Sequence, residues 1–132
     1  MALQCEIVTP ERKALSCDAD FVVLPAAEGE MGVYPMHEPV VATLNAGSVR
    51  VTVEGAQEPT KFVVAGGYAQ VEAKRVIVLA NRAQAVADID KEAVAAELDE
   101  LKGTLEDLKP DDASYAYTEG EIDWRKLLLA QI

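Results

Sequence analysis

The sequence contains little cysteine, little histidine and little positive charge. Its 132 residues include 2 cysteines and 1 histidine, too few for a disulfide framework or for a metal site built from both residue types. Lysine and arginine total 12 against 23 aspartates and glutamates, and the formal net charge is −11. Nucleic-acid binding and docking on anionic lipid both need a basic surface. We therefore expect no nucleic-acid partner, no metal and two free thiols packed as small apolar groups.

Long apolar runs are absent as well. The longest fall far short of the roughly 18 to 20 residues that span a bilayer, so no direct lipid insertion is expected. Residues 1–10 lack a charged segment followed by a long apolar core, so no secretion signal is visible. Together with the two isolated cysteines, these absences indicate the reducing cytosol.

No catalytic constellation is present. His37 is the only histidine, and no serine or cysteine lies in a nucleophile-elbow motif. Gly66-Gly67 is not followed by the Gly-Lys-Ser/Thr of a phosphate loop, and no calcium-binding Asp-x-Asp-x-Asp-Gly loop exists. We predict that the chain is not an enzyme and needs no cofactor. The two glycines instead predict a tight bend at which a side chain would clash.

The composition changes near Ala87. Residues 1–87 hold five of the six prolines, six of the eight glycines and all the alternating segments. They carry 7 basic and 10 acidic side chains, whereas residues 88–132 carry 5 and 13, so most of the negative charge lies in the second part. We expect two domains, at 1–87 and 88–132.

Short strands are predicted throughout residues 1–87. Two segments alternate apolar and polar residues with the period of a half-buried strand: Leu3-Gln4-Cys5-Glu6-Ile7 and Val49-Arg50-Val51-Thr52-Val53. The runs 21–24 and 76–79 are continuously apolar, which is typical of strands covered on both faces. Glycine and proline turn signals separate these segments, and no helices alternate with them. The pattern predicts an antiparallel β-sandwich or flattened barrel.

Two amphipathic helices are predicted in residues 88–132. The first carries an apolar stripe at spacings of 4, 3, 4 and 3 residues: Val94, Leu98, Leu101, Leu105 and Leu108. Asp88 or Asp90 is expected to cap its start, and the turn-forming segment 109–112 ends it. The second helix places four apolar side chains on one face: Trp124, Leu127, Leu128 and Ile132. Gly120 is expected to break or shorten its start. The chain is thus α+β, with an αα-hairpin after the sandwich.

One block and five shorter segments form a specific combination. The block, which is tightly constrained by its glycines and prolines, is Gly29-Glu30-x-Gly32-x-x-Pro35-x-His37-x-Pro39. The shorter segments are residues 7–12, 46–51, 65–71, 76–80 and 88–90. In this order and spacing they resemble the epsilon subunit of bacterial F-type ATP synthases.

The resemblance implies a non-catalytic rotor subunit. In that family an N-terminal β-sandwich binds the gamma subunit and rests on the membrane-embedded ring of c subunits, which couples ion flow to ATP synthesis. A C-terminal two-helix hairpin folds down or extends along gamma, and the extended form often blocks ATP hydrolysis. The implied location is the cytoplasmic face of the bacterial cell membrane, as a peripheral part of the ATP synthase.

The resemblance also implies particular contact residues. Glu30 and Met31 match the loop that faces the c ring, and Thr9, His37 and Ala42 match positions against gamma. Arg125, Lys126 and Trp124 are the hairpin residues expected to reach the alpha and beta subunits. Glu38 departs from the family, which usually has a small residue there, so this contact must be wet or must supply a cation.

The hairpin departs from the family in two further ways. Relatives that bind regulatory ATP open the first helix with Ile-Asp-x-x-Arg-Ala, but here Ile89 and Asp90 are followed by Ala93 at the arginine position. A triphosphate needs opposing positive charge, so we expect weak or absent ATP binding. Inhibitory hairpins present basic residues to acidic segments of alpha and beta, whereas this hairpin is strongly acidic. We therefore expect weak inhibition, acting through its apolar face and Arg125-Lys126.

Two alternatives belong to other classes of protein. One is a free-standing, ligand-binding β-sandwich with a helical oligomerisation arm, although the apolar stripe covers only about two heptads and confident coiled coils need three or four. The other is a small hydrolytic or isomerising enzyme, which would need a pocket with a base around His37.

Overall fold

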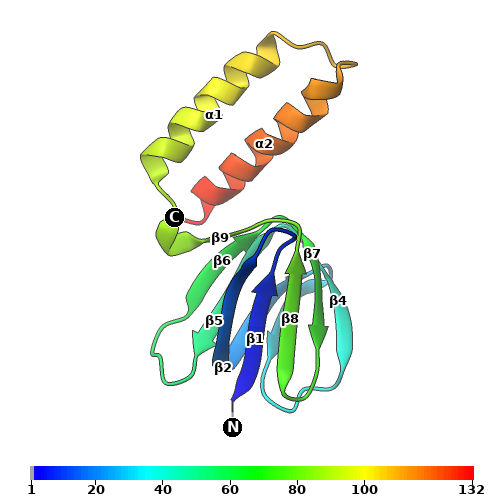
Figure 1. Ribbon diagram of the computed structural model, residues 1–132, viewed down its shortest axis with the longest axis vertical. Helices are drawn as coiled ribbons and strands as arrows, with labels where there is room; N and C mark the ends of the chain where they lie inside the picture. Colours follow the sequence, from blue (N-terminus) through cyan, green and yellow to red (C-terminus); the bar gives the residue numbers. More distant parts are fainter. Residues whose placement is uncertain (1) are drawn as a thin grey trace. The chain divides into compact units, whose positions relative to one another are not determined.

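The computed structural model describes residues 2–132 and divides the chain into two compact units. The boundary lies between Ala87 and Asp88, where the composition changes. The first unit consists of strands and the second of two helices (Figure 1).

Nine strands form the first unit within the described residues. In chain order they are β1 (Leu3–Val8), β2 (Lys13–Ala26), β3 (Gly29–Val33), β4 (Val40–Leu44), β5 (Gly47–Val53), β6 (Thr60–Val64), β7 (Gly67–Val71), β8 (Arg75–Ala80) and β9 (Ala83–Ala85). A short 3-10 turn, η1 (Val86–Asp88), follows. The predicted β-sandwich is confirmed.

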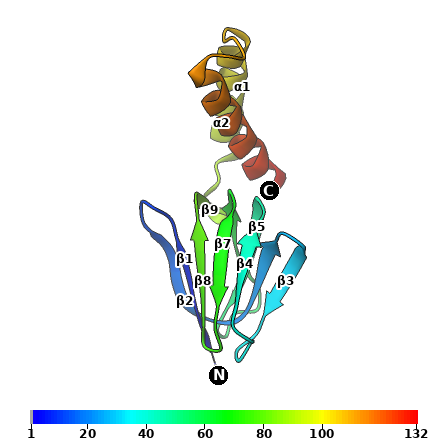
Figure 2. The same ribbon diagram turned by 90° about the vertical axis from the view of Figure 1, so that its right-hand side faces the viewer.

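The sandwich has two layers that share the long strand β2. In one layer β1, β8, β7 and β4 are neighbours, and the first half of β2 pairs with β1. Figure 2 shows β8, β7 and β4 side by side. In the other layer the second half of β2 lies between β3 and β5, followed by β6 and β9. A single pairing of Ala26 with Leu44 joins β2 to β4 and closes the flattened barrel.

All strand pairs in this sheet are antiparallel except one. Strands β1 and β8 run parallel, with Cys5 opposite Val76 and Ile7 opposite Val78. The sequence pattern did not predict this pair, because parallel pairing here joins strands from opposite ends of the domain rather than a strand–helix–strand unit.

The core lies between the layers and follows the predicted alternation. Leu3, Cys5 and Ile7 are fully buried, as are Val49 and Val51. The prediction of strands covered on both faces is wrong for the run 76–79, where Val76 and Val78 are fully buried while Leu79 remains 39% exposed. In the run 21–24 every side chain is buried or half-buried, and Phe21 stacks on Tyr34. The second run therefore turns one set of side chains toward the core and the other outward.

A tight bend at Gly66 and Gly67 connects β6 to β7. Both residues have positive φ, 105° and 132°. A Cβ on Gly67 would lie 2.1 Å from the Leu79 carbonyl oxygen, whereas one on Gly66 would meet nothing closer than 3.6 Å. The predicted clash is thus located at Gly67.

The second unit is an antiparallel pair of helices, α1 (Lys91–Glu106) and α2 (Ala113–Ala130). The Asp90 side chain accepts a hydrogen bond from the Ala93 amide at 3.1 Å, and Asp112 caps α2 through the Ser114 amide at 2.9 Å. The most deeply buried side chains of the two helices are Val94, Leu98, Thr118, Ile122, Trp124 and Leu128. The predicted hairpin is therefore confirmed.

The prediction that Gly120 breaks or shortens the start of α2 is wrong. The helix runs through Gly120 without interruption, because it starts seven residues earlier at Ala113, is capped by Asp112, and packs buried side chains from Thr118 onward. A glycine inside a helix costs about 1 kcal/mol relative to alanine, which packing of this size exceeds.

Candidate partner-binding surfaces

The outward side of the β1–β8–β7–β4 layer carries exposed apolar side chains. Register places Val8, Leu79, Tyr68 and Thr43 in one row across the four strands. The next row contains Glu6, Ile77, Gln70 and Val41. Val41 is 69% exposed, Tyr68 54% and Leu79 39%. We call the set Val8, Val41, Tyr68, Ile77 and Leu79 the apolar face.

Of the three residues expected to contact gamma, two flank this face and the third lies on the core side of the same layer. Thr9 directly follows Val8 at one end of β1, where its hydroxyl donates to the Arg12 carbonyl at 3.1 Å. His37 lies in the loop before β4, beyond the opposite end of the face, and its Nδ1 donates to the Glu38 carbonyl at 2.7 Å. Ala42 is half-buried opposite Ala69, on the core side of β4.

A partly buried carboxylate borders the apolar face. Glu6 projects outward beside Ile77 but is only 6% exposed, because Lys13 and Arg75 lie over it. The Lys13 ammonium is 3.3 Å and the Arg75 guanidinium 3.1 Å from its oxygens. The hydrogen bond from Lys13, with the positive charges of both partners, holds the pKa of Glu6 below its ordinary value, although burial acts in the opposite direction.

Replacing Glu6 by glutamine is expected to destabilise the sandwich at neutral pH and much less in acid. The folded-state pKa lies below the unfolded value of about 4.3, so the carboxylate stabilises the fold above that pH and loses this effect as the pH falls. Urea denaturation of wild type and Glu6→Gln, measured from about pH 7 to about pH 3, should show that the difference between their free energies of unfolding becomes smaller in acid. Glu58→Gln, at an exposed position, is the control for removing a charge. A gap that widens in acid would contradict this assignment.

A groove opens between β4 and the end of the β2–β3 hairpin. It has a volume of about 480 Å³ and is lined by residues 26–31 and 40–43. It brings together Glu30, Met31 and Ala42, which the sequence had assigned to two different partners. Glu30 is paired with Arg50 at 2.7 Å across β2, while Met31 lies opposite Leu24 and packs toward the core.

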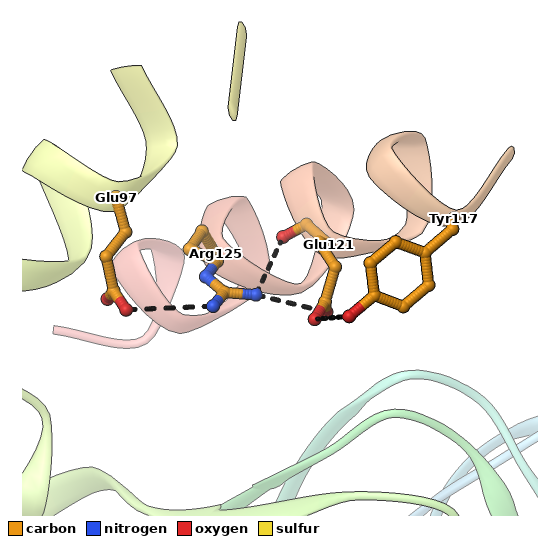
Figure 3. A network of polar contacts seen from close by, with 4 residues as sticks. All are labelled: Glu97, Tyr117, Glu121 and Arg125. Carbon is orange, nitrogen blue, oxygen red and sulfur yellow. Dashed lines mark hydrogen bonds and ion pairs between the residues drawn. The ribbon is translucent and has the colours of Figure 1, made fainter. Parts of the chain in front are cut away.

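The hairpin residues expected to reach alpha and beta differ in their surroundings. Trp124 is 7% exposed within the hairpin, and Lys126 is exposed. Arg125 is held between the two helices: its guanidinium contacts Glu121 at 3.0 Å and Glu97 of α1 at 3.7 Å (Figure 3). The Tyr117 hydroxyl donates to Glu121 at 3.3 Å and extends this network. Arg125 thus serves as a link between α1 and α2.

Comparison with known proteins places this architecture in a family. The model of the ATP synthase delta/epsilon chain β-sandwich domain matches residues 2–86. The chain belongs to the ATP synthase epsilon-chain family. It is 40% identical over 103 residues to the ATP synthase epsilon chain of Carboxydothermus hydrogenoformans, covering 78% of this chain and 75% of that one. It is 42% identical over 112 residues to that of Granulibacter bethesdensis, covering 77% and 82%.

Solved structures agree with the epsilon-chain fold. A chain in the Euglena gracilis mitochondrial ATP synthase superposes with a TM-score of 0.75 and 26% identity, covering 98% of this chain and 81% of that one. A chain of the Tetrahymena thermophila central stalk and c ring shares the fold, with a TM-score of 0.62 and 15% identity over 99% and 96% of the two chains.

As an epsilon chain, the protein is a non-catalytic subunit of ATP synthase. This assignment replaces both alternatives, the free-standing binding module and the small enzyme. Within residues 2–132, neither helix has the length and apolar character required to cross a bilayer.

The apolar face was missed at the level of sequence. The residue that could have indicated this face is Leu79. It ends a continuously apolar run and was expected to be covered by the protein itself, but it is 39% exposed. Tyr68 stood inside a matching segment without being singled out. Only the strand register shows that these two side chains are neighbours.

Proposed function

We propose that this epsilon chain is a rotor subunit of the central stalk, which binds gamma through the apolar face and meets the c ring near Glu30 and Met31. It couples ion translocation to ATP synthesis from the cytoplasmic face of the bacterial membrane, as a peripheral component. The observation that carries this proposal is the apolar face, with Val41, Tyr68 and Leu79 exposed together on one sheet.

The energetics of the apolar face favour a permanent protein partner. Burying a large apolar side chain contributes about 1.5–3 kcal/mol, and several adjacent ones can offset the cost of association. Aromatic residues such as Tyr68 are typical anchors of protein interfaces. Thr9 and His37 lie beyond opposite ends of this face, where they would meet the rim of the same partner.

The groove supports a second, more polar contact. Glu30 is exposed and paired with Arg50, so the guanidinium already partly compensates the negative charge of its carboxylate. The carboxylate can therefore contact a polar loop without an isolated charge being buried. Met31 and Ala42 supply an apolar lining beside it. This combination suits the polar loops of the c ring.

The ion pairs and the acidic surface of the hairpin support the proposal that this chain inhibits ATP hydrolysis only weakly. Arg125 is 17% exposed at its side chain and is bonded to Glu97 and Glu121, so contact with an acidic segment of alpha or beta would first require these pairs to break. Lys126 is the exposed basic residue beside it. The remaining surface is predominantly acidic and would repel acidic partner segments.

The chain is expected to bind ATP weakly or not at all. The start of α1 offers Lys91 but no arginine at the position of Ala93, and acidic residues surround it. Isothermal titration with MgATP should give no affinity tighter than about 1 mM. A micromolar dissociation constant would contradict this expectation. The Ala93→Arg variant, which supplies a guanidinium at that position, tests whether the missing group is the cause.

Replacing Tyr68 by alanine is expected to weaken gamma binding by about 30-fold or more, the effect of losing an interface anchor worth about 2 kcal/mol. The measurement is the dissociation constant of the full chain for purified gamma. Tyr117→Ala is the matched control, because Tyr117 is also exposed but lies in the hairpin. It should change binding by less than about twofold. Equal losses for the two variants, or no loss for Tyr68→Ala, would contradict docking on the apolar face.

A further inference from the structure

The two cysteines of the chain face each other across neighbouring strands. In the antiparallel pair β1–β2, Cys5 is directly opposite Cys17, between the pairs Leu3–Ala19 and Ile7–Leu15. Residues directly opposite in such a pair project to the same side, here toward the core. Both thiols are free in the structure.

The backbone spacing at this pair is compatible with a disulfide. The Gln4 amide donates to the Lys74 carbonyl next to β8, so the amide of the following residue, Cys5, is directed toward β2. Cys5 and Cys17 therefore form a hydrogen-bonded pair, for which Cα atoms are about 5.5 Å apart. Disulfides span Cα distances of about 4.4–6.8 Å, although their Cβ atoms lie closer together than in a relaxed strand pair. A disulfide here fits the backbone but is strained.

The two thiols differ in access. Cys5 in β1 is fully buried, whereas Cys17, in the first half of β2, is half-buried. Burial, with the nearby Cys17 and Glu6, raises the pKa of Cys5 to about 12, and burial with Asp18 raises that of Cys17. Cys17 is thus the thiol that a reagent in solution reaches first.

We propose that Cys5 and Cys17 are a reversible disulfide site, at which a small-molecule disulfide oxidises the sandwich. The Cys17 thiolate attacks the reagent, forms a mixed disulfide and releases one thiol. The Cys5 thiolate then attacks Cys17 Sγ, breaks the bond to the remaining half of the reagent and releases a second thiol. The two protein thiols lose two protons and two electrons, and the reagent is reduced to two thiols. Strain in the strand pair makes the product readily reducible.

The test is to incubate the full chain with oxidised glutathione under native conditions, quench with acid and map the products by mass spectrometry. Wild type is expected to give an intramolecular Cys5–Cys17 link with little glutathionylated chain. It should return to two free thiols with dithiothreitol. The rate should rise with pH, since both thiols must ionise.

Two variants assign the steps. Cys5→Ala removes the resolving thiol and should accumulate glutathione on Cys17. Cys17→Ala leaves only the buried thiol, which should stay unmodified over the same period. If wild type instead accumulates glutathionylated Cys17 as Cys5→Ala does, or links only between chains, the site does not exist. The wild-type products alone decide this, so the result does not depend on how well the variants fold.

Discussion

Replacing Gly67 by alanine is expected to destabilise the sandwich by more than about 3 kcal/mol, enough to unfold a domain of ordinary stability. The added Cβ would lie 2.1 Å from the Leu79 carbonyl oxygen and 3.0 Å from the Ala80 Cα. Both atoms belong to the backbone of β8, which pairs with β7 at this point and cannot move without breaking the ladder. Hydrogen exchange of the peptides covering β7 and β8, measured in increasing urea, reports the change.

Gly29→Ala is the matched control for this clash. Gly29 has the same φ of 132°, but a Cβ there would meet nothing within 4 Å. Its replacement therefore isolates the conformational cost of a positive φ, about 1–2 kcal/mol. The excess loss in Gly67→Ala measures the close approach of β7 and β8. Equal losses in the two variants would show that β8 relaxes and that the clash has no consequence.

Replacing Ile122 by aspartate is expected to unfold the helical hairpin. Ile122 is 5% exposed in the set of buried side chains that joins α2 to α1. Losing its packing and burying a carboxylate should together cost about 4 kcal/mol or more. Circular dichroism should lose its helical signal, Trp124 fluorescence should shift to the red, and proteolysis should concentrate in residues 88–132.

Lys126→Asp is the control for the introduced charge. Lys126 is on the same helix but exposed, so an aspartate there stays in water. Helix content and protease resistance should remain close to those of wild type, since exposed substitutions usually change stability by about 0.5 kcal/mol or less. If Ile122→Asp retained a resistant hairpin, the packing of α2 against α1 would not be what stabilises this unit.

Much of the fold follows from local patterns in the sequence. Alternation in residues 3–7 and 49–53 identified strands and their core sides, and the apolar spacing from Val94 to Leu108 identified α1. These predictions succeed because side-chain period reports directly which face is buried. The Gly120 prediction failed because propensity is a weak, local effect, and caps and packing elsewhere in α2 override it.

Features that depend on strand register could not be predicted from the sequence. The apolar face requires Leu79 to lie beside Tyr68, and the thiol pair requires a bulge near Ile7 and Val8 that shifts β1 against β2. Neither offset can be read from a local pattern in the sequence. The link from Arg125 to Glu97 likewise depends on how the two helices face each other. The sequence singled out Arg125 for a contact with a partner, which stays a prediction, and did not indicate its ion pairs within the hairpin.

The most direct test of docking through the apolar face is oxidative footprinting of the wild-type chain, free and mixed with gamma. Hydroxyl radicals label exposed tyrosines, and Tyr68 and Tyr117 are 54% and 70% exposed. In the complex Tyr68 should become protected, while Tyr117 should remain as reactive as in the free chain. A stoichiometric complex in which Tyr68 stays fully reactive, or a mixture in which no complex forms, would contradict the account.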